Sequence, residues 1–255
     1  MTYSLVAFDL DDTLAPSKSP LPKAMNNALV ELLKHVDVCV ISGANATQFR
    51  NQFLNNLTAT QSELERLHIM PTCGTHYERF VDGQWKILYR HELDEHTRAK
   101  AREVLENTAR ELGLWEDNPT GAIIEDRGSQ LTFSALGQDA SLEDKRAWDP
   151  TGEKKIRLRD AVASQLPLLE VRAGGSTSVD ITEKGIDKAY GMAKLVEQTG
   201  YSPQQIVFIG DRLDPAGNDY PVRAAGYPTI AVDGWEHTVE VIAELINSFD
   251  SSQEI

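Results

Sequence analysis

Acidic and polar side chains stand directly after three short apolar runs of the sequence. They are Asp9, Asp11 and Thr13 after residues 4–8, Ser42 after 36–41, and Asp211 and Asp219 after 206–209. Bounded apolar runs of this length are typical of strands buried in a parallel sheet. The carboxyl ends of such strands meet at one edge, where open α/β sheets bind their ligands. We therefore expect these side chains to converge on one site.

Several carboxylates at one sheet edge repel one another unless a cation neutralises them. Four of these residues are acidic, namely Asp9, Asp11, Asp211 and Asp219. A divalent cation with hard oxygen ligands is a suitable counterion, and Mg²⁺ keeps coordination positions open for phosphate oxygens. The sequence therefore predicts Mg²⁺ as the cofactor, with the four aspartates as its candidate ligands.

Phosphoryl transfer needs a nucleophile, a proton shuttle and donors that neutralise the transferred group. Asp9 can attack phosphorus as a carboxylate, and Asp11 can protonate the leaving oxygen and later deprotonate the acceptor. Ser42 and Thr13 can donate hydroxyl hydrogen bonds to the phosphate, and Lys188 can add a positive charge. This set indicates an enzyme that acts on a small phosphorylated substrate.

Each of these residues also has a simpler structural explanation when it is taken alone. An aspartate after a strand often caps a turn, Ser42-Gly43 is a common turn sequence, and Lys188 fits a solvated helix face. Their joint order favours chemistry, because each residue stands at the correct end of its own expected strand or helix.

The spacing of apolar residues predicts the elements that position this site. Strands are expected at 4–8, 36–41, 68–70, 206–209 and 229–232, and helices at 23–35, 44–57, 186–199, 219–225 and from 238. Their alternation predicts an α/β fold, with a Rossmann-like, doubly wound parallel sheet and helices on both faces.

Between these two stretches the pattern changes. A hairpin is expected around Asp82-Gly83, helices at 92–112 and 155–166, strands at 123–125, 131–133, 168–172 and 177–181, and a polar stretch at 137–154. Such runs of hairpins and helices predict an inserted α+β domain. We place the core domain at residues 1–83 and 184–255 and the inserted domain at residues 84–183.

The composition limits the partners of the protein. The chain has 25 Lys and Arg against 39 Asp and Glu, a net charge of −14, which disfavours nucleic acid and anionic membranes as partners. No segment approaches the roughly 20 apolar residues of a membrane helix, and Asp9 interrupts any N-terminal signal sequence. The two cysteines, Cys39 and Cys73, suggest neither a disulfide framework nor a zinc site. We therefore expect a cytoplasmic protein.

The order of the motifs resembles that of the haloacid dehalogenase superfamily of aspartate-nucleophile phosphotransferases. The segment 9–13 matches its DxDxT motif, Ser42 its second motif, Lys188 (better than Lys184) its third, and Gly210-Asp211 with Gly217-Asn218-Asp219 its fourth. Four ordered motifs that span the whole core domain make this resemblance specific.

The inserted domain resembles the type IIB cap of this superfamily, which implies that it closes over the substrate and determines specificity. Within that group the chain is most similar to the eukaryotic-type phosphomannomutases. Residues 125–134 resemble their cap segment EFRNGMLNVS, and residues 174–180 resemble their GGQISFDV. The acidic loop 211–219 also has the same length as theirs.

The resemblance implies a role for each site residue. In the core domain, Asp9 is expected to be the nucleophile, Asp11 the acid and base, Asp211 a Mg²⁺ ligand and Asp219 close to the metal. Lys18 and Gly43 are expected to contact the substrate, as is Thr13. In the inserted domain, Arg127 is expected at a distal phosphate, and Ser178 and Asp180 near sugar hydroxyls. A solvated hairpin arginine remains the alternative for Arg127, and a turn residue at a strand end the alternative for Asp180. A homodimer through the cap is a further expectation.

One departure from the mutase pattern bears on the reaction. The mutase cap segment ends in a second arginine, where this chain has Gln138. A mutase must hold a bisphosphate by either end and needs cationic clamps in both domains. We therefore expect a Mg²⁺-dependent phosphatase of a small metabolite, a sugar phosphate, that works through an aspartyl-phosphate.

Two other classes of function remain to be compared with hydrolysis. The first is a phosphomannomutase or another hexose-phosphate mutase, which would use a hexose 1,6-bisphosphate as activator. The second is a non-catalytic phosphate-binding protein, which is disfavoured because all four motifs keep their reactive side chains.

Overall fold

The computed structural model describes residues 3–253. The chain divides into a first unit, made of Met1–Arg90 and Asp187–Ile255, and a second unit, His91–Ile186. An inserted domain between two parts of a core is therefore present, but its limits differ from those predicted. Residues 84–90 belong to the first unit, because they pair as a strand with its sheet.

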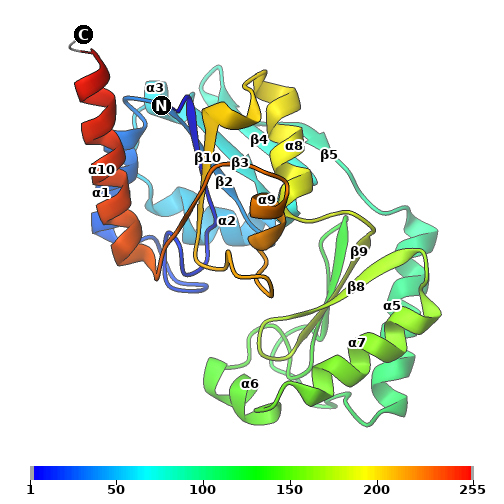
Figure 1. Ribbon diagram of the computed structural model, residues 1–255. Coiled ribbons are helices and arrows are strands. Elements are labelled where there is room, and N and C mark those ends of the chain that lie inside the picture. Colours follow the sequence, from blue (N-terminus) through cyan, green and yellow to red (C-terminus); the bar gives the residue numbers. More distant parts are fainter. Residues whose placement is uncertain (1–2, 254–255) are drawn as a thin grey trace. The chain divides into compact units, whose positions relative to one another are not determined.

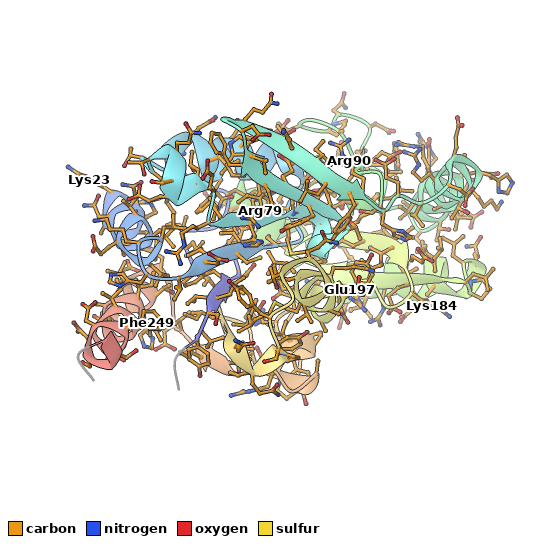
Figure 2. The ribbon with its side chains drawn as sticks, turned by 90° about the horizontal axis from the view of Figure 1, so that it is seen from above. Lys23, Arg79, Arg90, Lys184, Glu197 and Phe249 are labelled. Atoms are coloured by element: carbon orange, nitrogen blue, oxygen red, sulfur yellow. The ribbon has the colours of Figure 1, made fainter. Side chains whose placement is uncertain are left out.

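The first unit contains a seven-stranded sheet in the order β11-β10-β1-β2-β3-β4-β5. Its strands are β1 (Leu5–Phe8), β2 (Asp37–Ile41), β3 (Leu67–Met70), β4 (His76–Val81), β5 (Gln84–Arg90), β10 (Ile206–Gly210) and β11 (Thr229–Ala231). The pairs from β11 to β3 are parallel, whereas β4 and β5 are antiparallel. The predicted hairpin, with Arg79 on β4 and Arg90 at the end of β5, thus extends the core sheet (Figure 2).

Helices cover both faces of this sheet (Figure 1). They are α1 (Lys23–Leu32), α2 (Ala46–Gln52), α3 (Gln61–Leu64), α4 (Pro71–Gly74), α8 (Lys188–Thr199), α9 (Tyr220–Ala224) and α10 (Trp235–Gln253). Along β1, Val6 and Phe8 pack into the cluster that contains residues of α1 and α10, while Leu5 and Ala7 pack into the cluster that contains residues of α8. Because strand side chains alternate between faces, β1 is buried on both sides, and the doubly wound prediction is confirmed.

The second unit contains a four-stranded antiparallel sheet in the order β6-β7-β9-β8 and three helices. The elements are β6 (Ile124–Asp126), β7 (Gln130–Ser134), β8 (Leu169–Gly174), β9 (Ser178–Glu183), α5 (Glu95–Glu111), α6 (Leu142–Trp148) and α7 (Glu153–Gln165). Leu131, Phe133 and Val179 share a core with residues of α5 and α7. The residues that alternate with these apolar ones along β7 and β9 are polar, so this sheet has one apolar and one polar face.

Helix α6 lies in the stretch that we expected to be only polar. Ser141 begins it by accepting a hydrogen bond from the backbone N–H of Asp144. None of its residues is buried, so no apolar stripe marks it in the sequence. Within residues 3–253, no helix has both the length and the apolar character needed to cross a membrane.

Candidate active site

Asp9 and Lys188 form a buried ion pair at the carboxyl edge of the core sheet. Asp9 follows β1, and its backbone N–H donates to the carbonyl of Ile209 on the neighbouring strand at 3.0 Å. Asp187 caps α8, which places Lys188 at the first helical position. The Lys188 Nζ lies 2.6 Å from Asp9 Oδ1, and both side chains are almost fully buried. The solvated-lysine alternative for Lys188 is therefore wrong.

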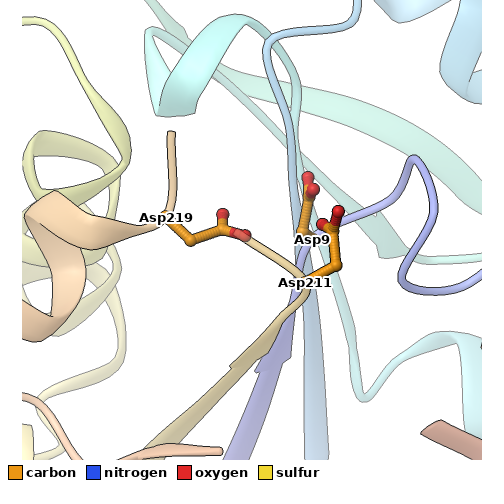
Figure 3. Close-up of side chains that lie close together, drawn as sticks. All are labelled: Asp9, Asp211 and Asp219. Atoms are coloured by element: carbon orange, nitrogen blue, oxygen red, sulfur yellow. The ribbon is translucent and has the colours of Figure 1, made fainter. Parts of the chain in front are cut away.

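Three carboxylates converge at this point. One oxygen each of Asp9, Asp211 and Asp219 lies within 4.8 Å of the others, and Figure 3 shows the three side chains directed toward a common space. Lys188 also contacts Asp219, with 2.5 Å between Nζ and Oδ1. The site therefore joins residues from sequence segments that are about 200 positions apart, as we predicted from the strand ends.

Burial and the neighbouring charges together shift the pKa values of this group. Burial raises the pKa of Asp9 to about 7; the charge of Lys188 opposes this rise, and the charge of Asp219 adds to it. Burial, and then the charge of Asp219, also raise the pKa of Asp211. Burial alone would lower the pKa of Lys188, but the charges of Asp9 and Asp219 raise it. A further cation would stabilise the ionised carboxylates.

Two local features hold the acidic loop in place. A Cβ on Gly210 would lie 2.4 Å from Asp219 Oδ2, so only glycine leaves room for this carboxylate. The Thr13 hydroxyl donates to Asp211 Oδ1 at 3.2 Å and accepts from the Asp211 N–H at 3.1 Å. We had expected Thr13 to donate to the phosphate, but its hydroxyl proton is directed to Asp211. Thr13 thus orients a candidate metal ligand.

The Asp11 side chain lies outside the carboxylate group. Its Oδ1 accepts hydrogen bonds from the backbone N–H of Lys18 at 2.8 Å and from Gln52 Nε2 at 3.0 Å, and its Oδ2 accepts one from Gln48 Nε2 at 3.2 Å. The prediction that the Asp11 carboxylate is a metal ligand is therefore wrong, because three N–H donors direct it elsewhere. Its expected role as acid and base remains a prediction.

Ser42, Gly43 and Lys18 are the remaining predicted site residues of the first unit. Ser42 follows β2 and is buried, and its Oγ accepts a hydrogen bond from the Ala44 N–H at 3.2 Å. At Gly43 a Cβ would meet no heavy atom within 4 Å. Lys18 is exposed and has a φ of 56°. Contacts of these residues with a substrate remain predictions.

Asp180 lies within β9 on the polar face of the second unit's sheet. Its Oδ1 accepts hydrogen bonds from Thr132 Oγ1 at 2.7 Å and from Gln130 Nε2 at 2.8 Å. Burial raises its pKa, although the hydrogen bond from Thr132 and the charge of Arg127 oppose the rise. The alternative of a turn residue at a strand end is wrong for Asp180, since the residue pairs with Thr132 and Arg172 in the middle of the sheet.

Arg127 and Ser178 belong to the same unit. The guanidinium of Arg127 donates to Glu125 Oε2 from Nη2 at 2.7 Å and from Nε at 3.0 Å, and the side chain is only 11% exposed. The alternative of a solvated hairpin arginine is therefore wrong. Ser178 pairs with Ser134 at the beginning of β9. Binding of a phosphate by Arg127 and of a sugar hydroxyl by Ser178 or Asp180 remains a prediction.

Sequence reasoning did not identify Gln48 and Gln52 as parts of the site. They stand four residues apart on α2, the helix that follows Ser42, and both donate to Asp11. The sequence did contain a signal for them. Two glutamines four residues apart share one face of a helix, and this helix follows a strand that ends at a predicted site residue.

Comparison with known proteins agrees with this architecture. Residues 6–222 match the family model described as haloacid dehalogenase-like hydrolase. The chain belongs to this family. The family assignment shows that the protein is an enzyme of this family, and the roles of Asp9, Lys188 and the acidic loop remain predictions.

The chain is also similar to several phosphomannomutases over most of its length. A phosphomannomutase of Saccharomyces cerevisiae is 23% identical over 96% of this chain and 94% of its own length. One of Solanum lycopersicum is 27% identical over 86% of this chain and 84% of its own length. The chain is thus a phosphomannomutase-like member of the family.

Solved structures support the fold. The IMP-nucleotidase of Plasmodium falciparum superposes with a TM-score of 0.72 at 14% identity, over 96% of this chain and 69% of that one. A haloacid dehalogenase-like hydrolase of Bacteroides thetaiotaomicron superposes with a TM-score of 0.63 at 15% identity, over 96% of this chain and 100% of that one. At such identities the likeness concerns the fold alone.

Proposed function

We propose that this protein is a Mg²⁺-dependent phosphatase that hydrolyses a small phosphorylated metabolite, a sugar phosphate, through an aspartyl-phosphate. The observation that carries the proposal is that the Asp9 carboxylate contacts the Lys188 ammonium and lies close to the carboxylates of Asp211 and Asp219. A nucleophile, a fixed cation and an oxygen-rich pocket for a second cation are the requirements of phosphoryl transfer.

Mg²⁺ fits the residues that are present. Asp9, Asp211 and Asp219 offer three carboxylate oxygens within 4.8 Å of one another, and Lys188 neutralises only part of their charge. All donors are hard oxygens, which favours Mg²⁺ over softer transition metals. When bound, Mg²⁺ would neutralise phosphate oxygens and lower their repulsion of the attacking carboxylate.

The residues of the chain divide the reaction between them. An Asp9 oxygen attacks phosphorus, the bond from phosphorus to the ester oxygen breaks, and a proton passes from Asp11 to that oxygen. A water oxygen then attacks phosphorus, the bond to Asp9 breaks, and the water proton returns to Asp11. Lys188 holds the transferred phosphate by its charge, and Ser42 donates to one of its oxygens.

Hydrolysis is favoured over a mutase reaction by the residues of the second unit. Position 138 is a neutral glutamine, and the Arg127 charge is balanced by Glu125. A bisphosphate intermediate that must be held by its distal phosphate needs uncompensated positive charge there. The phosphomannomutase names of the relatives favour the second candidate, a mutase that returns the phosphate from Asp9 to a sugar hydroxyl.

One assay distinguishes the two candidates. Purified protein is incubated with Mg²⁺, mannose 1-phosphate and a trace of glucose 1,6-bisphosphate, and free phosphate and mannose 6-phosphate are measured in the same tube. We expect free phosphate without the isomer, and an EDTA control should abolish its release. Formation of mannose 6-phosphate would establish the mutase instead. If neither product forms, a panel of other sugar phosphates tests whether any ester is hydrolysed.

A further inference from the structure

Two segments of the first unit fix the carboxylate of Asp11. The backbone N–H of Lys18 and the side-chain amide of Gln52 donate to Oδ1, and the side-chain amide of Gln48 donates to Oδ2. The carboxylate therefore has both a fixed position and a fixed rotation about its terminal bond. Among the described residues, Oδ2 accepts only the one bond from Gln48, at 3.2 Å, so this oxygen has room to carry a transferred proton.

The two glutamines are themselves held in place. Gln48 Nε2 also donates to Gln52 Oε1 at 3.0 Å, and the Gln48 backbone N–H donates to the capping residue Asn45 at 2.8 Å. Gln52 is only 4% exposed, and its backbone carbonyl accepts a hydrogen bond from the backbone N–H of Leu21 at 2.9 Å. The glutamine pair is thus a rigid attachment of Asp11 to α2, the helix that follows Ser42.

Displacement at phosphorus requires the proton donor to stand away from the nucleophile. In an in-line displacement the leaving oxygen lies on the far side of phosphorus from the attacking oxygen. A proton donor for that oxygen must therefore lie outside the group of Asp9, Asp211 and Asp219. The hydrogen bonds from α2 keep the Asp11 carboxylate outside this group.

We propose that Gln48 and Gln52 are positioning residues, which hold Asp11 where it can protonate the leaving oxygen of the substrate. This inference rests on the proposed phosphoryl transfer. A group that must donate a proton contributes most when it is held in one geometry, as an orienting third group does for other catalytic bases.

Substrates with different leaving groups reveal such a role. p-Nitrophenolate is stable without a proton, whereas the alkoxide of glycerol 2-phosphate leaves only when it is protonated. We expect Gln52→Met and Gln48→Met to lower kcat/KM for glycerol 2-phosphate about tenfold or more, because general acids contribute roughly 10²–10⁴-fold. For p-nitrophenyl phosphate the change should stay below about twofold. Met keeps the length of the side chain and removes its N–H donors.

The controls separate positioning from folding. Asn51→Leu changes an exposed residue of the same helix, and kcat/KM for both substrates should remain at the wild-type level. Gln48 is less buried than Gln52, so Gln48→Met tests the role if Gln52→Met does not fold. In an Asp11→Asn background the glutamine changes should cause no further loss, because residues that act through one another are not additive.

Each outcome decides the question. A selective loss for glycerol 2-phosphate supports the positioning role. An equal loss for both substrates indicates a merely structural role, and no loss in either variant shows that Asp11 does not need the amides; both results overturn the inference and leave the proposed function intact. If the wild-type protein cleaves neither ester in the presence of Mg²⁺, nor any sugar phosphate of the panel, the proposed function fails and the inference fails with it.

Discussion

Asp9 of the first unit and Asp180 of the second are both aspartates whose pKa is raised by burial, yet their partners differ in kind. Asp9 faces the Lys188 ammonium and two further carboxylates. The carboxylate of Asp180 accepts hydrogen bonds from a neutral hydroxyl and a neutral amide. One aspartate is thus part of a strongly charged group, and the other belongs to a hydrogen-bonded sheet face.

The difference follows from where the two residues lie on their strands. Asp9 stands past the carboxyl end of β1, where loops and a helix start bring other charges close. Asp180 lies within β9, where its neighbours are the cross-strand residues of an antiparallel sheet. A group whose charge changes during a reaction needs other charged groups close by, as Asp9 has. A group that binds neutral hydroxyls can work among neutral donors and acceptors, such as those around Asp180. We therefore propose chemistry for the first unit and recognition for the second.

The largest effect is expected from removal of the Asp9 nucleophile. Asp9→Asn should lower kcat for phosphate release by about 10⁴-fold or more, because the amide cannot form the phosphorylated intermediate. Steady-state phosphate release with Mg²⁺ measures this loss. Asp12→Asn, in the same loop and exposed, is the control and should retain activity. Near-normal activity of Asp9→Asn would disprove the assignment of the nucleophile.

Removal of the Lys188 charge should impair both activity and stability. Lys188→Met leaves Asp9 and Asp219 buried without their cation, so we expect a loss of about 3–5 kcal/mol in the free energy of unfolding and of roughly 10²-fold or more in kcat/KM. Urea denaturation and phosphate release measure the two effects. Lys184→Met, at the exposed alternative lysine, should change neither; a comparable loss there would contradict the choice of Lys188.

The pH dependence of stability should be strong in the first unit when metal is removed. The pKa of Asp9 is about 7, against an ordinary value of 3.8, so folded Asp9 keeps a proton that the unfolded chain has released. The resulting stabilisation is fully present below the ordinary pKa and is lost as the pH rises through 7. Between about pH 5 and pH 8 in EDTA, the free energy of unfolding should fall by on the order of 3 kcal/mol.

Two comparisons sharpen this prediction. Asp9→Asn should flatten the dependence, because the asparagine does not titrate, and Mg²⁺ should restore stability at the higher pH by binding the ionised carboxylates. Chemical denaturation in a series of buffers measures both. A wild-type stability that rises over this range in EDTA, or an unchanged slope in Asp9→Asn, would contradict the assignment of the titrating group.

The smallest effect is expected from the second unit. Asp180→Asn keeps the shape of the side chain and removes a charged acceptor, so we expect KM for a sugar phosphate to rise about tenfold while kcat changes less than about threefold. For p-nitrophenyl phosphate, which lacks sugar hydroxyls, both constants should stay within about twofold. Asp160→Asn, exposed on α7, is the control. A loss in kcat for both substrates would place Asp180 in the chemistry and remove the contrast between the units.

Much of the first unit could be predicted from the sequence, because its decisive information is local. An apolar run that ends in Asp9 or Asp211 specifies a buried strand and the polar residue just beyond its end. Parallel strands align these ends at one edge, so the convergence of Asp9, Asp211 and Asp219 followed from the order of elements. Lys188 stands at the start of a helix, and the family resemblance was needed to choose it over Lys184.

The tertiary structure alone decided which partner each side chain takes. The hairpin at 76–90 joins the core sheet because β3 offers it an open edge, which no residue within the hairpin specifies. The carboxylate of Asp11 points to Gln48 and Gln52, and the hydroxyl of Thr13 to Asp211, since residues 37 to 198 positions away are brought within hydrogen-bonding distance. Strand ends are encoded by neighbours in sequence, whereas the rotamer of a polar side chain depends on donors and acceptors that only the folded chain assembles.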